Sequence, residues 1–393
     1  MTARRVAGAL MGLALLTAVT GAIGGDTAEA GPLPTSAELT VQKVGELVDR
    51  DATVSYRSTD QSITVHHPGA TYVKVRFAGL DLAPGDRLTV SDPEGVEVHT
   101  YHGAPGEGWR DGDSDYTLHE NGVFAALSIE GDTAVVEIHR ADDDLDAKPG
   151  GVQIDGYWRG YDQAEYEAAN PGIESVCGVE GRRDSICYQS SHPTEYQRSR
   201  AVGRLLMGGS ACTAFRVGDT NRLLTNNHCM STQSAIAGSE TQFDYECATC
   251  GGNNPKTPTK VSGATMHKTS SQLDYTLYSV NSFSSITGFG TLYLETRQPV
   301  LNERIYIPGH GDAAPKRLSV TVQSGGANCK IDQVQYLTIN TGYMCDTSGG
   351  SSGSPVIAGS SHKVIALHRI GGCLNGGTRM SLIYPEIAGL ISN

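Results

Sequence analysis

Cysteine is absent from the first 176 residues of this 393-residue chain, whereas nine cysteines lie between Cys177 and Cys373. The absence excludes disulfide-stabilised structure from the N-terminal part and predicts a domain boundary near residue 176. Because nine is an odd number, at least one thiol has no partner within the chain.

Positive charge, aromatic side chains and long apolar runs are also scarce. The formal net charge of −13 argues against nucleic acid as a partner, because phosphate binding requires a basic face. Aromatic residues make up 6% of the chain and there are 48 glycines, a composition typical of β structure with many turns. Beyond residue 30 no apolar run is long enough to cross a bilayer, so we expect no membrane partner.

The one long apolar run lies near the N-terminus, over residues 6–22. It follows Arg4 and Arg5 and precedes the small-x-small pattern of an export cleavage site at residues 28–30. We therefore expect residues 1–30 to be a signal peptide rather than a membrane anchor, and the protein to be secreted and extracellular. Export in turn predicts disulfide bonds among the cysteines.

Short apolar runs separated by Pro, Gly and Asp predict an antiparallel β-sandwich over about residues 52–140, inside an N-terminal domain spanning residues 31–150. The clearest strand covers residues 72–77, where three apolar side chains on one face alternate with Lys74 and Arg76 on the other. We expect this domain to be either a pro-region that is removed or an accessory domain that is kept.

The segments around the sandwich are less regular. A polar lead-in is expected to be helical over residues 36–50, and the acidic, turn-rich residues 151–175 are expected to be a linker. Three aspartates at alternate positions, Asp111, Asp113 and Asp115, resemble calcium ligands. They lack the glycine and distal glutamate of a calcium-binding loop, so a solvated loop is the preferred interpretation and we expect no metal site.

Residues 176–393 again have the pattern of an all-β domain, with a short C-terminal helix expected over residues 385–392. Within it the stretch "CDTSGGSSGSPV", residues 345–356, is either a flexible linker or a turn that presents one serine to a substrate. Glycines allow successive backbone N–H groups to converge on an oxyanion, and the apolar strand that begins at Pro355 would fix the turn. These features favour the catalytic interpretation.

A serine nucleophile needs a base and a carboxylate that orients the base. The segment "LLTNNHCM" supplies His228 after a β run, and "QLDYTLY" supplies Asp274 at the start of another. The order His228, Asp274, Ser352 is that of chymotrypsin rather than that of subtilisin or the α/β-hydrolases.

Together these three motifs resemble those of chymotrypsin/trypsin-fold serine endopeptidases. The resemblance is to the bacterial branch with the lysyl and glutamyl endopeptidases, in which Ser-Gly-Ser-Pro replaces Ser-Gly-Gly-Pro. The resemblance covers residues 176–393 and implies an all-β protein with a two-barrel protease domain after the β-sandwich. It implies that Ser352 is the nucleophile, His228 the general base and Asp274 the orienting carboxylate. The oxyanion hole would consist of the N–H groups of Gly350 and Ser352.

The same resemblance gives the substrate pocket and the disulfides. Asp346, six residues before the nucleophile, would lie with Thr347 at the pocket and favour cleavage after Arg or Lys, whereas His368 occupies the place of a histidine that reads glutamate in glutamyl endopeptidases. Cleavage after Glu therefore stays open as an alternative. The implied bridges, which leave Cys247 unpaired, are Cys212–Cys229, Cys177–Cys373, Cys187–Cys250 and Cys329–Cys345.

Activation by cleavage is a separate question. Residues 200–203 are similar to a trypsin activation site, at which the new N-terminus pairs with an aspartate next to the nucleophile. Ser351 occupies that place here and cannot form the ion pair, so we predict that no activating cut is made after Arg200.

The function expected from the sequence is a secreted serine endopeptidase that acts on proteins or peptides, as a monomer and without a cofactor. One alternative is a catalytically silent, protease-like binding protein. Another is that the sandwich carries the main role as a carbohydrate- or surface-binding module, although no row of exposed aromatic residues supports this.

Overall fold

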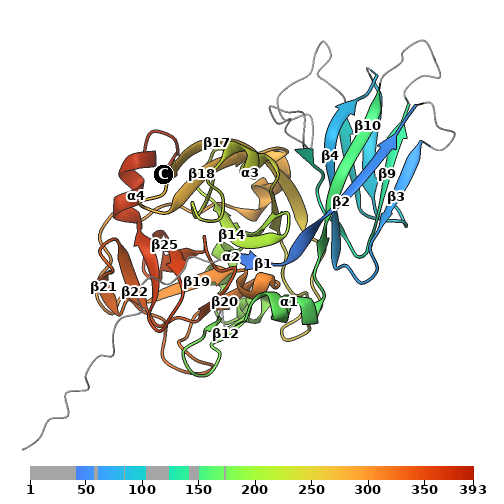
Figure 1. Ribbon diagram of the computed structural model, residues 1–393. Helices are drawn as coiled ribbons and strands as arrows, with labels where there is room; N and C mark the ends of the chain where they lie inside the picture. The colour runs from blue at the N-terminus through green and yellow to red at the C-terminus, as the bar shows by residue number, and fades with distance from the viewer. Residues whose placement is uncertain (1–40, 57–60, 84, 103–123, 141–149, 172–173) are drawn as a thin grey trace, which may run out of the picture. The chain divides into compact units, whose positions relative to one another are not determined.

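The computed structural model describes residues 41–56, 61–83, 85–102, 124–140, 150–171 and 174–393 (Figure 1). The expected signal peptide and the three candidate calcium-binding aspartates lie outside these residues. The described residues belong to one compact unit. Within the described part, no helix has the length and apolar character needed to span a bilayer.

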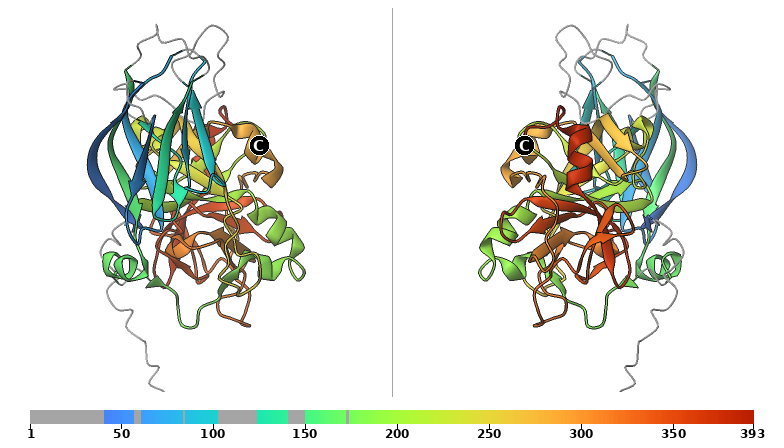
Figure 2. Two further views of the ribbon diagram at one scale, coloured as in Figure 1. Left: turned by 90° about the vertical axis from the view of Figure 1, so that its right-hand side faces the viewer. Right: turned by 90° about the vertical axis from the view of Figure 1, so that its left-hand side faces the viewer.

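The N-terminal part contains two antiparallel sheets, seen as blue to green strands in Figure 2. The first has the order β2 (Gly45–Val54), β10 (Gly151–Gly160), β4 (Tyr72–Asp81) and β7 (Phe124–Ala125), with β8 (Ile129–Glu130) also on β4. The second has the order β3 (Ser62–His66), β9 (Thr133–His139), β5 (Arg87–Ser91) and β6 (Val98–His102). Buried side chains of both sheets form one hydrophobic cluster, as expected for a β-sandwich.

Two expectations for this part are wrong. The described residues of the lead-in form strands β1 (Gln42–Lys43) and β2 rather than a helix. The expected linker contains β10, which pairs with both β2 and β4 in the middle of a sheet. Within β10, Val152 and Ile154 are fully buried because the alternation places both on the core face. A helix, α1 (Gln163–Ala169), follows.

The C-terminal part contains a closed barrel of six strands, since β14 pairs with β15 as well as with β13. Its strands are β14 (Ser210–Arg216), β13 (Val202–Met207), β16 (Glu240–Phe243), β17 (Thr259–Ser270), β18 (Tyr275–Val280) and β15 (Leu223–Thr225). Two short helices accompany it, α2 (Pro193–Ser199) and α3 (Gln233–Ala237).

Most of the remaining strands of the C-terminal part form an antiparallel sheet of their own. It contains, in order, β12 (Arg182–Asp184), β20 (Arg317–Ser319), β19 (Ile305–Gly309), β24 (Pro355–Ala358), β25 (Val364–Ile370), β26 (Asn375–Arg379), β22 (Asn340–Tyr343) and β21 (Gln333–Tyr336). No closing pair joins its two ends within the described residues, so one closed barrel is found where two were expected. A two-strand pair links β11 (Glu174–Ser175) to β23 (Thr347–Ser348), and the C-terminal helix α4 spans Met380–Ile387, earlier than predicted.

Strand β1 joins the sandwich to the barrel. Gln42 and Lys43 pair with Ala211 and Ser210 of β14, which extends the barrel sheet by one strand (Figure 1). Helix α1 lies where the chain leaves the sandwich, and the hydroxyl of its Tyr166 accepts a hydrogen bond from the Gln42 side chain at 2.6 Å. The segment that leaves the sandwich is therefore held to β1, and through β1 to the barrel.

Buried charges connect the same two parts. Lys74 of β4 lies 2.8 Å from Glu240 of β16, and Ser128 donates to the same carboxylate through its N–H and its hydroxyl. Lys260 of β17 lies 2.6 Å from Glu97, which precedes β6. Each ion thus finds its counter-ion in the other part of the chain, which offsets the cost of burying it.

Candidate active site

The barrel positions His228 just after β15. Asn226 donates from its side chain to the main-chain oxygen of Asp274 at 2.8 Å, which ties the end of β15 to the start of β18. The N–H of His228 donates to Asp274 Oδ1 at 2.9 Å, and His228 Nδ1 lies 2.8 Å from Asp274 Oδ2. The carboxylate therefore holds both the backbone and the ring of this histidine.

Asp274 is almost completely buried, with 2% of its surface exposed. Its φ of 54° lies in the left-handed region, which Asp tolerates better than most residues. Burial alone would raise the pKa of Asp274, but hydrogen bonds from His228 and the nearby charge of Arg369 hold it below its usual value. The group is therefore an anion at neutral pH.

Ser352 is partly exposed on a tight turn between β23 and β24. Gly350 and Gly353 have φ values of 90° and 89°, which only glycine adopts readily. A Cβ atom at Gly350 would lie 2.7 Å from the main-chain oxygen of His310, and one at Gly353 would overlap that of Thr213. Both glycines are required by conformation and by space.

A disulfide and a hydrogen bond together connect this turn to the histidine. Cys229, next to His228, forms a disulfide with Cys212, and Thr213 beside it donates its N–H to the main-chain oxygen of Ser352 at 2.8 Å. The Nε2 atom of His228 is buried and has no hydrogen-bond partner among the described residues. The structure thus joins His228 to Asp274 directly, whereas no hydrogen bond links His228 to Ser352. Such bonds are often long before substrate binds.

The N–H groups of Gly350 and Ser352 donate to no acceptor within the described residues. In contrast, the N–H groups of Ser351 and Ser354 are used inside the turn, where they bond to the main-chain oxygens of Ser348 and Ser351. Two donors at the turn are therefore available to an oxygen of a substrate.

Asp346 is completely buried, and both of its carboxylate oxygens have partners. Oδ1 accepts the N–H of Cys177 at 2.9 Å and Oδ2 accepts the N–H of Gly181 at 2.7 Å. Burial raises the pKa of this carboxyl despite these two bonds. The adjacent Thr347 is also buried and donates to the side chain of Asn375 at 2.9 Å. In this arrangement Asp346 anchors residues 177–181.

His368 lies beside the serine turn. Its N–H donates to the oxygen of Ser354 and its oxygen accepts the N–H of Gly353. The ring is buried, and Nδ1 lies 2.7 Å from the hydroxyl of Tyr343. Burial, with a smaller contribution from His228, lowers the pKa of His368 to about 3, so the ring is neutral at neutral pH.

Three disulfides are formed, namely Cys177–Cys373, Cys187–Cys250 and Cys212–Cys229. The expected bridge between Cys329 and Cys345 is not formed. Both residues are buried free thiols, as is Cys247. Burial, together with a hydrogen bond between Cys345 and Cys329, raises the pKa of Cys345 well above its usual value. A buried thiol that stays protonated is a poor partner for disulfide formation.

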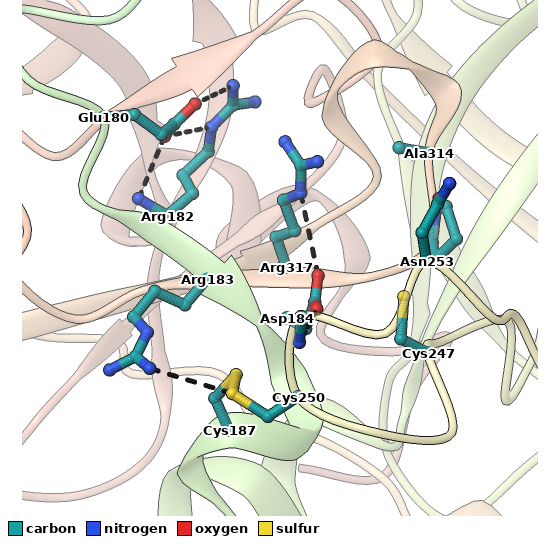
Figure 3. Close-up of a pocket in the computed structure, with 12 residues that line it drawn as sticks. Glu180, Arg182, Arg183, Asp184, Cys187, Cys247, Cys250, Asn253, Ala314 and Arg317 are labelled. Atoms are coloured by element: carbon teal, nitrogen blue, oxygen red, sulfur yellow. Dashed lines mark hydrogen bonds and ion pairs between the residues drawn. A yellow bond between two sulfur atoms is a disulfide. The ribbon is translucent and has the colours of Figure 1, made fainter.

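A pocket of about 470 Å³ lies beside the Cys187–Cys250 bridge (Figure 3). Its arginines are already engaged: Arg182 pairs with Glu180, and Arg317 lies 4.0 Å from Asp184. None of the three candidate catalytic residues lines it.

Among the described residues, one cluster has the geometry of a set of metal ligands, and it consists of His228, Cys212 and Cys229. The two sulfur atoms are bonded to each other in a disulfide and are therefore not free to bind a metal ion.

Arg369 is a further residue of the site that was not predicted from the sequence, and its Nε donates to Asp274 Oδ2 at 2.9 Å. Its position directly after His368 was visible in the sequence, but no motif pointed to it. Only the approach of β25 to the start of β18 brings it to the carboxylate.

Comparison with known proteins gives the family. Residues 212–367 match the model of the trypsin-like peptidase domain. Secreted RxLR effector protein 73 of Plasmopara viticola is 30% identical over 324 residues, which cover 78% of this chain and 76% of that protein. This share of the chain exceeds residues 176–393, so the likeness includes part of the N-terminal region.

Two solved structures are similar at low scores. A Glu endopeptidase in complex with MPD has a TM-score of 0.40 and 17% identity, covering 55% of this chain and 97% of that one. The inactive form of the Rv3671c protease has a TM-score of 0.36 and 13% identity, covering 52% and 95%. The assignment rests on the peptidase-domain match and the effector: the chain belongs to the same family as that secreted protein and contains a trypsin-like peptidase domain.

Proposed function

We propose that the protein is a secreted serine endopeptidase that hydrolyses peptide bonds through Ser352, His228 and Asp274. The observation that carries the proposal is the two-point attachment of His228 to Asp274, which leaves a buried Nε2 without a partner. Because Nδ1–H donates to the Asp274 carboxylate, Nε2 is the unprotonated nitrogen of the neutral ring, as a base requires.

In the proposed reaction Ser352 Oγ attacks the substrate carbonyl carbon while its proton passes to His228 Nε2. The carbonyl oxygen becomes an oxyanion that the N–H groups of Gly350 and Ser352 receive. The C–N bond then breaks, the amine leaves with the proton from His228, and an ester to Ser352 remains. Water repeats the sequence in place of serine and releases the acid. Asp274 stabilises the imidazolium in both halves.

The substrate side chain is the finer part of the proposal. Cleavage after Arg or Lys, as first expected, would require Asp346 to exchange a backbone hydrogen bond for a substrate cation in a fully buried position. Cleavage after Glu requires no such exchange. Tyr343 has no other described acceptor, so its hydroxyl donates to His368 Nδ1 and leaves Nε2–H as a donor for a carboxylate. We therefore propose glutamyl-type cleavage first and basic cleavage second.

We also propose that the sandwich stays attached in the active enzyme. Its removal would expose Glu240 and Lys260 without their counter-ions and would strip β1 from the barrel sheet. The likeness to the effector over more than the peptidase domain supports a shared two-part chain.

A peptide panel with Arg, Lys, Glu, Phe or Ala before the scissile bond tests the function, with Ser352→Ala as the control. Cleavage after Glu that is lost in the control supports the whole proposal. Cleavage after Arg or Lys keeps the catalytic residues and returns the pocket to Asp346. Absence of cleavage with every peptide favours the silent binding protein.

A further inference from the structure

Arg369 connects the strand beside the serine turn to the carboxylate that holds His228. We propose that Arg369 is a positioning residue, which locks Asp274 in place and offsets part of its charge so that hydrolysis extends to lower pH. The inference rests on the proposed function.

The contacts of Asp274 leave it no freedom to turn. Oδ1 accepts the N–H of His228, and Oδ2 accepts from both His228 Nδ1 and Arg369 Nε, at 2.8 and 2.9 Å. The side chains are enclosed, with 14% of Arg369 and 2% of Asp274 exposed. A charge-assisted hydrogen bond in such a site is short and strong.

The fold directs Arg369 to this position through a β-bulge. In the pairing of β25 with β26, His368 lies opposite Gly377 and Ile370 opposite Gly376, so Arg369 is the extra residue. A bulge breaks the alternation of side chains and re-aims the residue that it contains. Because His368 is bonded to the serine turn, the bulge fixes Arg369 relative to Ser352 as well.

The charge of Arg369 acts against the imidazolium that forms during catalysis. Among described titratable or charged groups, His228 and Arg369 face Asp274, and His368 is near enough to His228 to be affected by it. Asp274 is thus the one anion between two potential cations. Without the guanidinium, the negative charge of Asp274 acts on His228 alone. That charge favours the protonated form of the ring, which cannot act as a base.

The test is the pH dependence of kcat/KM for the full chain with its best peptide. In Arg369→Met, the acid limb is expected to move up by about one pH unit. In Arg369→Lys, which keeps the charge but not the Nε–H donor, it is expected to stay within about half a unit of the wild type. The matched control is Lys363→Met, which removes one positive charge from an exposed position just before β25. It is expected to leave the acid limb of the pH profile unchanged.

The outcomes separate this inference from the proposed function. If the wild type cleaves and Ser352→Ala does not, but the limb of Arg369→Met coincides with that of the wild type, the positioning role is wrong while the function stands. If only the melting temperature and kcat fall, Arg369 is merely structural and the inference is again overturned. If Arg369→Met does not fold, the Arg369→Lys profile decides, and an upward shift of a full unit would contradict the charge argument. If wild type and Ser352→Ala behave alike, the proposed function itself fails.

Discussion

Lys74 and Glu240 form a fully buried ion pair of 2.8 Å between the sandwich and the barrel, although they are 166 positions apart in the chain. Breaking such a pair leaves an unpaired charge inside the protein, which costs about 3–5 kcal/mol. We therefore expect Lys74→Met to lower the free energy of unfolding by about that amount, measured by denaturant titration of the full chain.

Two controls belong to this experiment. The double variant Lys74→Met with Glu240→Leu removes both charges and is expected to recover part of the loss. Glu46→Ala breaks a pair with Arg159 in which the glutamate is 50% exposed, and is expected to change stability by less than about 1 kcal/mol. Equal effects of Lys74→Met and Glu46→Ala would show that the buried pair adds nothing.

Attachment of the sandwich is expected to weaken in acid. Burial would raise the pKa of Glu97, but His99 and Lys260 lower it to about 2 from an ordinary value of 4.5. A depressed carboxyl pKa adds stability above 4.5, and that stability is lost as pH falls from 4.5 towards 2. Limited proteolysis across this range should cut between the two parts more readily at the lower end.

Glu97→Gln supplies the comparison for the acid experiment. The substitution removes the ionisable group. Limited proteolysis of the variant between the two parts should therefore already be faster than that of the wild type at pH 6, and it should depend less on pH. Identical pH profiles for the wild type and Glu97→Gln would assign the acid sensitivity to another group.

Asp346 is expected to act on stability rather than on substrate choice. Asp346→Asn replaces one of two acceptors of backbone N–H groups by a donor, which costs about 1–3 kcal/mol at a buried site. The melting temperature should fall, while the order of preference for the residue before the scissile bond stays the same in the peptide panel. Selective loss of cleavage after Arg or Lys would restore Asp346 to the substrate pocket.

The cysteines give a prediction that needs no assay of activity. With three disulfides and three buried free cysteines, the native protein should react slowly with a thiol reagent and the denatured, unreduced protein should titrate three thiols. A count of one would mean that Cys329 and Cys345 are joined, as the resemblance to the protease family implied.

The sequence predicted what depends on local pattern. The strand at residues 72–77 and the strands before His228 and after Asp274 were found, because alternation and short apolar runs carry that information. The burial of Lys74 could not be predicted, because Lys74 is buried against Glu240 of β16, in a distant part of the chain. Strand β10 was mistaken for a linker because its acidic approach hid the alternation of Val152 and Ile154.

The candidate site divides in the same way. His228, Asp274 and Ser352 were recognisable from motifs, and the structure ties the first two together. The partners of Asp346 were not recognisable, because residues 177–181 reach it only through the β11–β23 pairing. Arg369 was missed because its role depends on a bulge, which leaves no trace in a single sequence.

The proposed mechanism requires that Ser352, rather than its neighbours Ser351 and Ser354, is the nucleophile. Labelling of the full chain with a fluorophosphonate, followed by peptide mapping, tests it most directly, because the reagent bonds only to an activated serine. We expect one adduct, on Ser352, that is absent from His228→Ala. An adduct on Ser351 or Ser354, or no adduct on the folded protein, would contradict it.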